Sequence, residues 1–139
     1  MVDFEIVREW LAKADEDFEF ARVNFEEGKP FFAQICFHFQ QAAEKYLKSY
    51  IIAHELEFRK IHDLPMLLKI CMSHDPSLEQ LSEDSEYLTT FYVDTRYPVH
   101  WPTNFSQTET QKALESASRI RSIVKGKLDL PYGLKRIGA

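Results

Sequence analysis

The stretch "YVDTRYPVHW", Tyr92 to Trp101, gathers side chains that could do chemistry within ten residues. Arg96 carries a planar guanidinium, which matches the geometry of a phosphate or a carboxylate. Tyr92 and Tyr97 offer ring faces on which a nucleobase can stack, and Asp94 adds a carboxylate between them. This composition is compatible with binding of a nucleotide or RNA. In the alternative interpretation, Arg96 pairs with an internal acid and only locks the end of a helix.

His100 is the candidate for proton transfer in the same stretch. In phosphodiester cleavage it would act as general acid–base, while Arg96 would stabilise the developing negative charge. Only three residues separate the two side chains, and one of them is Pro98. Proline excludes the preceding residue from helical geometry, so a continuing helix cannot bring both side chains to one face. We therefore assign no catalytic residue, although Arg96 and His100 are the candidates, and we expect no RNA cleavage without metal.

A second group of candidate binding residues lies in "FHFQQAAEKYLKSYI" and in the "HDL" that follows it. Glu44, Lys45 and Lys48 share a helix face, and Glu44 and Lys48 have the favourable i,i+4 order. An internal partner for Arg96 would be Glu44. His62 and Asp63 could be a base with its orienting carboxylate, or an N-cap with a histidine packed in the turn.

A basic rim that binds phosphate is a further possibility, against the alternative of ordinary solvated side chains. It would combine Lys45 and Lys48 with Arg119, Arg121, Lys125 and Lys127. The overall charge of −5 does not argue against it, because acids concentrate near the N-terminus and bases near the C-terminus.

Several function classes find no support in the sequence. No cluster has the spacing of metal ligands, and no glycine-rich loop is present, so we expect no metal and no cofactor. Cys36 and Cys71 lack CxxC spacing and predict buried, reduced thiols in a cytoplasmic protein. The N-terminus does not resemble a signal peptide, and no apolar run approaches the roughly 20 residues that span a bilayer.

The length of 139 residues predicts one domain. Its 19 aromatic residues exceed what a slim bundle easily buries, so we expect a two-fold homodimer that shares apolar surface. No pattern predicts a strand.

Apolar periodicity predicts the helices that carry the candidate residues. The first has a stripe in steps of three and four, with Asp3 as N-cap and Gly28 as C-cap. Its stripe is Phe4, Val7, Leu11, Ala14, Phe18, Ala21 and Phe25. The second is expected from Pro30 to Glu55 and, being apolar on nearly every side, is expected to be surrounded by other helices.

Three more helices are expected in the second half of the chain. A short one spans Leu64 to about Ser73, and the next begins at Pro76 and ends at "TRYP". The last begins at a capping box of Ser106 and Glu109 and runs to about Lys127. The predicted fold is therefore all-α: an antiparallel up-and-down helical bundle of four long helices plus one short helix over residues 1–128, followed by a flexible tail, 129–139.

The combination of "QQAAEKYLK", "HDL" and "RYP", in this order, resembles the prokaryotic HEPN family (higher eukaryote and prokaryote nucleotide-binding domain) from about Phe4 to Leu128. The resemblance implies a helical bundle, usually a homodimer. It also implies a gene neighbour that encodes a small nucleotidyltransferase, as in toxin–antitoxin pairs. Many members are metal-independent ribonucleases with an R-x(4–6)-H motif at the dimer cleft.

This chain departs from the ribonuclease motif, because the spacer between Arg96 and His100 is one residue too short and Tyr97 follows the arginine. We therefore expect a homodimer that interacts with a nucleotide or RNA and acts with a small nucleotidyltransferase. One alternative is a divergent ribonuclease that uses Arg96 and His100. Another is a purely structural interaction module.

Overall fold

The computed structural model describes residues 2–92 and 105–132, and all regular structure in these residues is helical. The α-helices are α1 (Phe4–Glu26), α2 (Phe32–Ala53), α3 (Leu64–Met72), α4 (Ser82–Thr89) and α5 (Gln107–Tyr132); a 3₁₀ helix, η1 (Pro76–Leu81), precedes α4. The predicted all-α fold is confirmed. No helix in these ranges is both long enough and apolar enough to cross a membrane.

The helix boundaries follow local signals in the sequence. The carboxylate of Asp3 accepts a hydrogen bond from the Glu5 amide at 2.9 Å, as an N-cap does. Gly28, with φ +78°, adopts the left-handed conformation typical of the residue after a helix. Ser106 and Glu109 form the reciprocal capping box, with both bonds at 3.0 Å.

The helix predicted from Pro76 to "TRYP" is wrong in its extent. It divides into η1 and the eight-residue α4, which ends at Thr89. There the Thr89 hydroxyl accepts a hydrogen bond from the Leu64 amide at 3.1 Å, and the Thr90 hydroxyl donates to the Tyr87 carbonyl at 2.6 Å. Such side-chain bonds compete with continuation of a helix. The described residues therefore contain three long helices rather than four.

Two other boundaries differ from prediction. α2 begins at Phe32, so Pro30 precedes the helix instead of lying in its first turn. α5 continues through Tyr132, beyond the expected end at Lys127. The additional turn buries Leu128, which extends the apolar stripe of α5 by one step. The predicted start of the tail at Asp129 therefore falls within α5.

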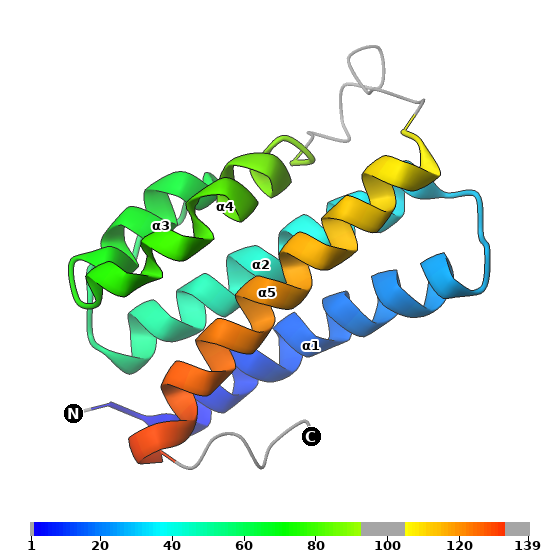
Figure 1. Cartoon of the computed structure of the whole chain (residues 1–139). Coiled ribbons are helices and arrows are strands. Elements are labelled where there is room, and N and C mark those ends of the chain that lie inside the picture. Colours follow the sequence, from blue (N-terminus) through cyan, green and yellow to red (C-terminus); the bar gives the residue numbers. More distant parts are fainter. Residues whose placement is uncertain (1, 93–104, 133–139) are drawn as a thin grey trace.

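α1 and α2 form an antiparallel hairpin; α5 crosses this pair, and α3 and α4 lie along the other side of α2 (Figure 1). The chain from 54 to 63, hereafter the return segment, runs back along α2, since the His62 carbonyl accepts a hydrogen bond from Gln40 at 3.3 Å. The Cys71 thiol then donates to the Leu47 carbonyl at 3.6 Å. α3 is consequently parallel to α2, and the bundle departs from strict up-and-down order at this connection.

α2 is the central helix of the core, as its nearly uniform apolar character predicted. Its side chains Phe39, Tyr46 and Tyr50 are among the largest that are fully buried. Cys36 and Cys71 are buried free thiols. Burial raises the pKa of Cys36 to about 11 and that of Cys71 to about 12, so both are protonated near neutral pH.

Candidate functional site

A polar cluster interrupts the apolar core where α2 meets the return segment. We call it the Glu44 cluster; it consists of Gln40, Glu44, Lys48, His62 and Tyr92. The Glu44 carboxylate receives three hydrogen bonds: from Lys48 Nζ at 2.9 Å, from His62 Nδ1 at 3.0 Å and from Gln40 Nε2 at 3.3 Å. The Glu44 and Lys48 side chains are each 6% exposed, so this is a buried ion pair with additional hydrogen bonds.

Two aromatic rings cover the Lys48 ammonium. Its Nζ lies 5.7 Å from the Phe58 ring centroid and 6.0 Å from that of Trp10. The two rings contact each other edge-on, with centroids 5.7 Å apart. This environment adds cation–π attraction to the ion pair with Glu44. Lys48 is therefore engaged within the fold, and its charge is not presented to a ligand.

His62 forms the accessible side of the Glu44 cluster, with its side chain 47% exposed. Its ring stacks on Tyr92, with centroids 4.3 Å apart and an interplanar angle of 14°. An ionised carboxylate only accepts hydrogen bonds, so the tautomer that fits this contact has its proton on Nδ1 and leaves Nε2 as an acceptor. A base oriented by a carboxylate has this arrangement.

The orienting carboxylate of His62 is thus Glu44 and not Asp63, the other residue of the suggested pair. Asp63 instead caps α3 and accepts a hydrogen bond from the Met66 amide at 3.1 Å. The sequence alternative in which Asp63 is an N-cap is confirmed.

Lys45, which was predicted beside Glu44 and Lys48, lies in a different cluster. Its ammonium pairs with Asp17 of α1, and Asp17 also contacts His38 Nδ1 at 3.2 Å. Burial alone would raise the pKa of Asp17, but the hydrogen bonds from His38 and Lys45 outweigh it and hold the pKa below its ordinary value.

The neighbouring residue Tyr46 donates its hydroxyl to Asp15. Asp15 also receives Lys125 Nζ at 2.7 Å and Arg121 Nε at 3.4 Å, both from α5. The two carboxylates Asp15 and Asp17, with their partners, connect α1, α2 and α5; we call this set the interlock cluster.

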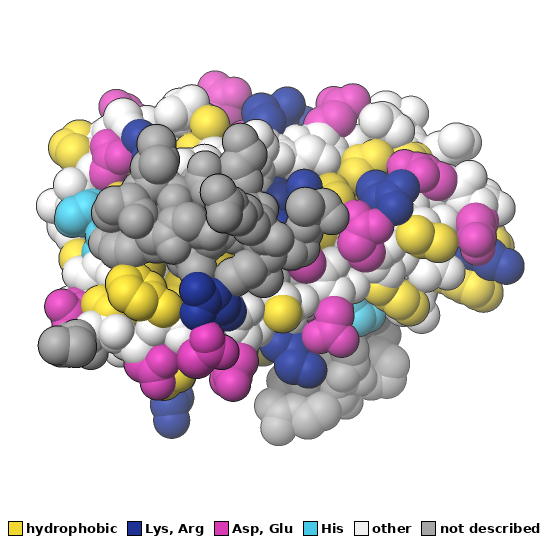
Figure 2. Space-filling view, turned by 90° about the horizontal axis from the view of Figure 1, so that it is seen from below, with side chains coloured by type: hydrophobic (Ala, Val, Ile, Leu, Met, Phe, Trp, Pro, Cys, Tyr) yellow, Lys and Arg dark blue, Asp and Glu magenta, His cyan; other side chains and the backbone are white. Residues whose placement is uncertain are grey.

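The basic rim suggested by the sequence is not available as a set of free cations. Arg119 holds Asp84 through bonds of 2.7 to 3.1 Å, and Lys127 pairs with Asp75 at 2.7 Å. On the face seen in Figure 2, the Lys and Arg side chains alternate with Asp and Glu rather than forming one positive patch. The rim interpretation finds no support in the described residues, because each of its six cations is paired with a carboxylate.

Four of the predicted site residues, Asp94, Arg96, Tyr97 and His100, lie outside the described residues. Their predicted roles stay predictions, including a hydrogen bond between Arg96 and a carboxylate of α2. Tyr92, the last described residue before them, belongs to the Glu44 cluster, so the chain leads from this cluster into the predicted stretch.

Sequence reasoning missed three members of this site. Gln40 had a sequence signal, because it precedes Glu44 by four residues on the same helix face, and the structure buries it fully. Trp10 and Phe58 had no such signal, because they meet over Lys48 from distant parts of the chain. Within the described ranges, no group of three or more His, Cys, Asp or Glu side chains is arranged to hold a metal ion.

Comparison with known proteins agrees with this architecture. The crystal structure of TT1696 from Thermus thermophilus superposes with a TM-score of 0.75 at 30% identity, covering 88% of this chain and 98% of that one. The crystal structure of ST0689, an archaeal HEPN homologue, gives 0.70 at 25% identity, covering 88% and 97%.

A relative from Methanocaldococcus jannaschii, named "Putative toxin MJ1304", is 25% identical over 141 residues, covering 92% of this chain and 91% of its own. The model of the HEPN domain matches residues 7–127. This match includes every described residue of the Glu44 cluster and nearly all of the five α-helices. The chain belongs to the HEPN family.

Proposed function

We propose that this protein is the HEPN component of a toxin–antitoxin type system and acts as a homodimer that interacts with a nucleotide or RNA. The relative named as a toxin supports the biological role. The Glu44 cluster supports the molecular one, because a histidine oriented by a carboxylate of α2 and a tyrosine ring lie at the surface on connecting segments. This arrangement is the observation that carries the proposal.

The chemistry of the exposed side of this cluster suits a nucleobase. His62 and Tyr92 are stacked on each other, and Phe37 lies 6.2 Å from the Tyr92 ring. Stacking on aromatic rings binds single-stranded bases with little dependence on sequence. In the proposal, Arg96 supplies the phosphate contact, with Asp94 and Tyr97 beside it, and Lys45 and Lys48 keep the supporting helix in place.

The homodimer is proposed from apolar surface that a lone bundle leaves uncovered. Phe20, Val23 and Phe31 are 48%, 39% and 56% exposed and lie near the α1–α2 turn. Shared apolar surface is the usual reason for two-fold association. Sedimentation at tens of micromolar, a concentration on the scale of common protein affinities, is expected to give the mass of a dimer; a monomer would contradict the proposal.

The proposed partner is a small nucleotidyltransferase that acts as the antitoxin. The family resemblance supports this choice, and the relative's name as a toxin supports the existence of a partner. Co-expression with a nucleotidyltransferase encoded beside the gene is expected to yield a complex that co-purifies and to relieve any growth defect.

The proposal is tested first by expression of the chain in a bacterial host and by RNA binding without metal. We expect slower growth and binding of a labelled single-stranded RNA in fluorescence anisotropy. Arg96→Ala and Tyr92→Ala are expected to weaken binding by about tenfold each, the equivalent of one charge-assisted or stacking contact. Arg8→Ala is the matched control, since Arg8 contacts only Glu5 on the surface of α1 among the described residues.

Normal growth together with no binding of RNA or nucleotide would leave the structural interaction module as the better interpretation. The ribonuclease alternative has a separate outcome. RNA cleavage without metal that disappears in both Arg96→Ala and His100→Ala would establish it, whereas we expect no cleavage above background.

A further inference from the structure

A pocket lies between the return segment and α3 and includes no residue of the Glu44 cluster. It has a volume of about 330 Å³, at the lower end of the range for small-molecule sites. Its apolar walls are Leu56, Met66 and Ile70, and the polar lining comes from Glu57, Arg59, Lys69 and Ser73. The two cations come from different elements, Arg59 from the return segment and Lys69 from the last turn of α3.

The described residues neutralise the positive charge of this pocket in part, whereas the cations of the α1–α2–α5 bundle are paired with buried or half-buried carboxylates. Lys69 forms no ion pair with any carboxylate in the described part of the chain. Among the residues that the structure describes, the ion-pair partner of Arg59 is Glu57, at 3.3 Å, and these side chains are 46% and 71% exposed. Such a surface pair contributes little and is easily exchanged for another anion.

The walls of the pocket determine what the anion is attached to. Met66 is 40% exposed, and its thioether interacts favourably with the edge of an aromatic ring. Leu56 and Ile70 add apolar surface beside it. An inorganic anion would leave this surface in water, whereas a phosphate joined to a base would cover it.

We propose that this pocket binds the phosphate and the base of a nucleotide, with Arg59 and Lys69 on the phosphate and Met66 against the base. Binding of an anion is inferred from the residues of the pocket alone. The identification of the ligand as a nucleotide rests on the proposed function. The same chemistry belongs to a free nucleotide and to one unit of an RNA chain. Glu57 competes with the phosphate for Arg59 and thereby weakens the site.

The test is a titration of the full-length, ¹⁵N-labelled protein with AMP and, separately, with a short single-stranded RNA. We expect shifts of the amide signals of Glu57, Lys69 and Ser73. Lys69→Gln is expected to weaken binding about tenfold, the effect of losing one charge-assisted contact. Glu57→Gln is expected to tighten binding a few-fold, since it frees Arg59. Opposite effects from two neighbouring exposed residues distinguish direct binding from damage to the fold.

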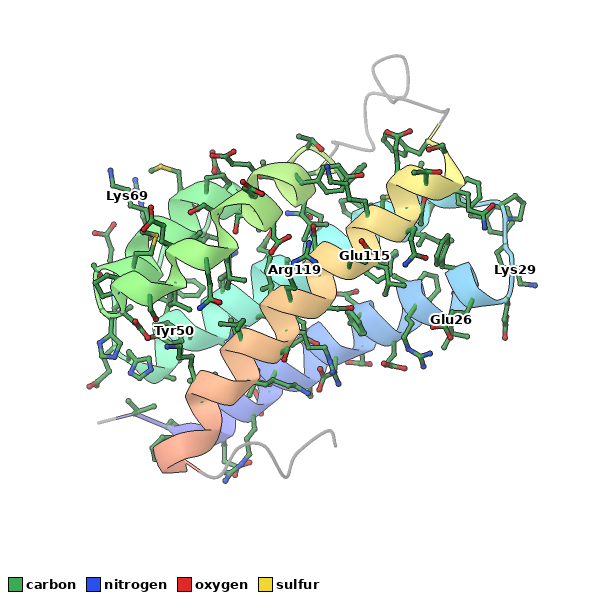
Figure 3. All side chains as sticks on the ribbon, in the orientation of Figure 1. Glu26, Lys29, Tyr50, Lys69, Glu115 and Arg119 are labelled. Atoms are coloured by element: carbon green, nitrogen blue, oxygen red, sulfur yellow. The ribbon has the colours of Figure 1, made fainter. Side chains whose placement is uncertain are left out.

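Matched controls lie at the far end of the molecule, where Figure 3 shows Glu26 and Lys29 at the α1–α2 turn, distant from Lys69. Lys29→Gln removes the same charge as Lys69→Gln. Glu26→Gln removes a surface partner of an arginine, Arg22, as Glu57→Gln does. Neither control is expected to change the affinity, and urea unfolding checks that all four variants stay folded.

A response to AMP that depends on Lys69 assigns the site to a free nucleotide, and a response to RNA alone assigns it to a unit of a chain. Amide shifts elsewhere only, or equal affinities of wild type and Lys69→Gln, would overturn the inference. If Arg96→Ala abolishes RNA binding while Lys69→Gln has no effect, the inference fails and the proposed function stands. If the pocket binds AMP in a protein that neither binds RNA nor slows growth, the inference stands, while the toxin role and RNA binding at the Glu44 cluster fail.

Discussion

The Glu44 cluster and the interlock cluster contain adjacent residues of α2, Glu44 and Lys45. They differ in the segments that supply their other members. Helices alone complete the interlock cluster, whose carboxylates Asp15 and Asp17 are each 18% exposed. A non-helical segment completes the Glu44 cluster and leaves His62 47% exposed. Adjacent helix residues point about 100° apart, so a single step along α2 changes the neighbours completely.

Because of this difference, the interlock cluster stabilises the fold, whereas the Glu44 cluster also has side chains that a ligand can reach. In the interlock cluster every described charge has a partner on another helix, so these groups hold α1, α2 and α5 together. In the Glu44 cluster the buried part is equally satisfied, but His62 and Tyr92 remain at the surface. Sites on connecting segments held by rigid helices commonly carry function.

The largest expected effect is that of Glu44→Ala. Removal of one partner from a buried ion pair leaves an uncompensated charge, here Lys48, and costs about 3 kcal/mol of unfolding free energy or more. Urea unfolding followed by circular dichroism measures this. The double variant Glu44→Gln with Lys48→Met should recover much of the lost unfolding free energy. If Glu44→Ala is as stable as wild type, the Lys48 ammonium must reach solvent in that variant.

A smaller loss, about 1 to 2 kcal/mol, is expected for Tyr46→Phe in the interlock cluster. Burial and the neighbouring Asp15 raise the pKa of Tyr46, as expected for a buried hydroxyl that donates to a carboxylate. Asp15 keeps Lys125 and Arg121 as partners, so the remaining groups stay satisfied. Tyr87→Phe is the control, because it removes an exposed hydrogen bond from the Tyr87 hydroxyl to the Glu109 carbonyl. Equal losses of unfolding free energy in the two variants would show that the buried hydrogen bond of Tyr46 is not special.

The pH dependence of the interlock cluster should follow Asp17. Its folded pKa is depressed, so its contribution is complete above the ordinary value of 3.8 and is lost as pH falls through the folded pKa. Wild type is therefore expected to lose stability below about pH 4 more steeply than Asp17→Asn. Urea midpoints between about pH 7 and pH 2 test this, with the exposed Glu16→Gln as control. Parallel curves for wild type and Asp17→Asn would refute it.

The smallest effect on stability, within about 0.5 to 1 kcal/mol, is expected for His62→Gln, because the side chain is half exposed. The same variant is expected to weaken RNA binding several-fold through loss of the ring that stacks on Tyr92. This combination would sharpen the contrast with Tyr46→Phe, which should affect stability and leave binding unchanged. A His62 variant that unfolds readily but binds normally would reverse the roles of the two clusters.

Much of the fold was predictable because its signals are local. The stripe of α1, the caps at Asp3 and Asp63 and the capping box at Ser106 each depend on residues within one or two turns. The break at Thr89 was not predicted, because it depends on the Leu64 amide, which lies 25 residues away. The direction of α3 was missed for a similar reason, since a ten-residue connection permits either orientation.

The candidate site was predicted in part. The i,i+4 pair of Glu44 and Lys48 agrees with the structure, whereas the stacking of His62 on Tyr92 was not predicted. Lys45 was grouped with Glu44 and Lys48 because it lies in the same stretch of helix. In the structure its ammonium pairs with Asp17 of α1 instead. The roles of Asp94, Arg96, Tyr97 and His100 remain predictions.

The sequence by itself determined α1, α2, α3 and the start of α5, several of their caps and the family, because periodicity, capping residues and motif order are local properties of the chain. Only the tertiary structure decided which charges neutralise each other and which stay available. Asp15 meets Lys125 across 110 residues, whereas Lys69 meets no carboxylate among the described residues. The energy of an ion pair depends on distance and burial, and for residues far apart in the chain both are set by the packing of the helices.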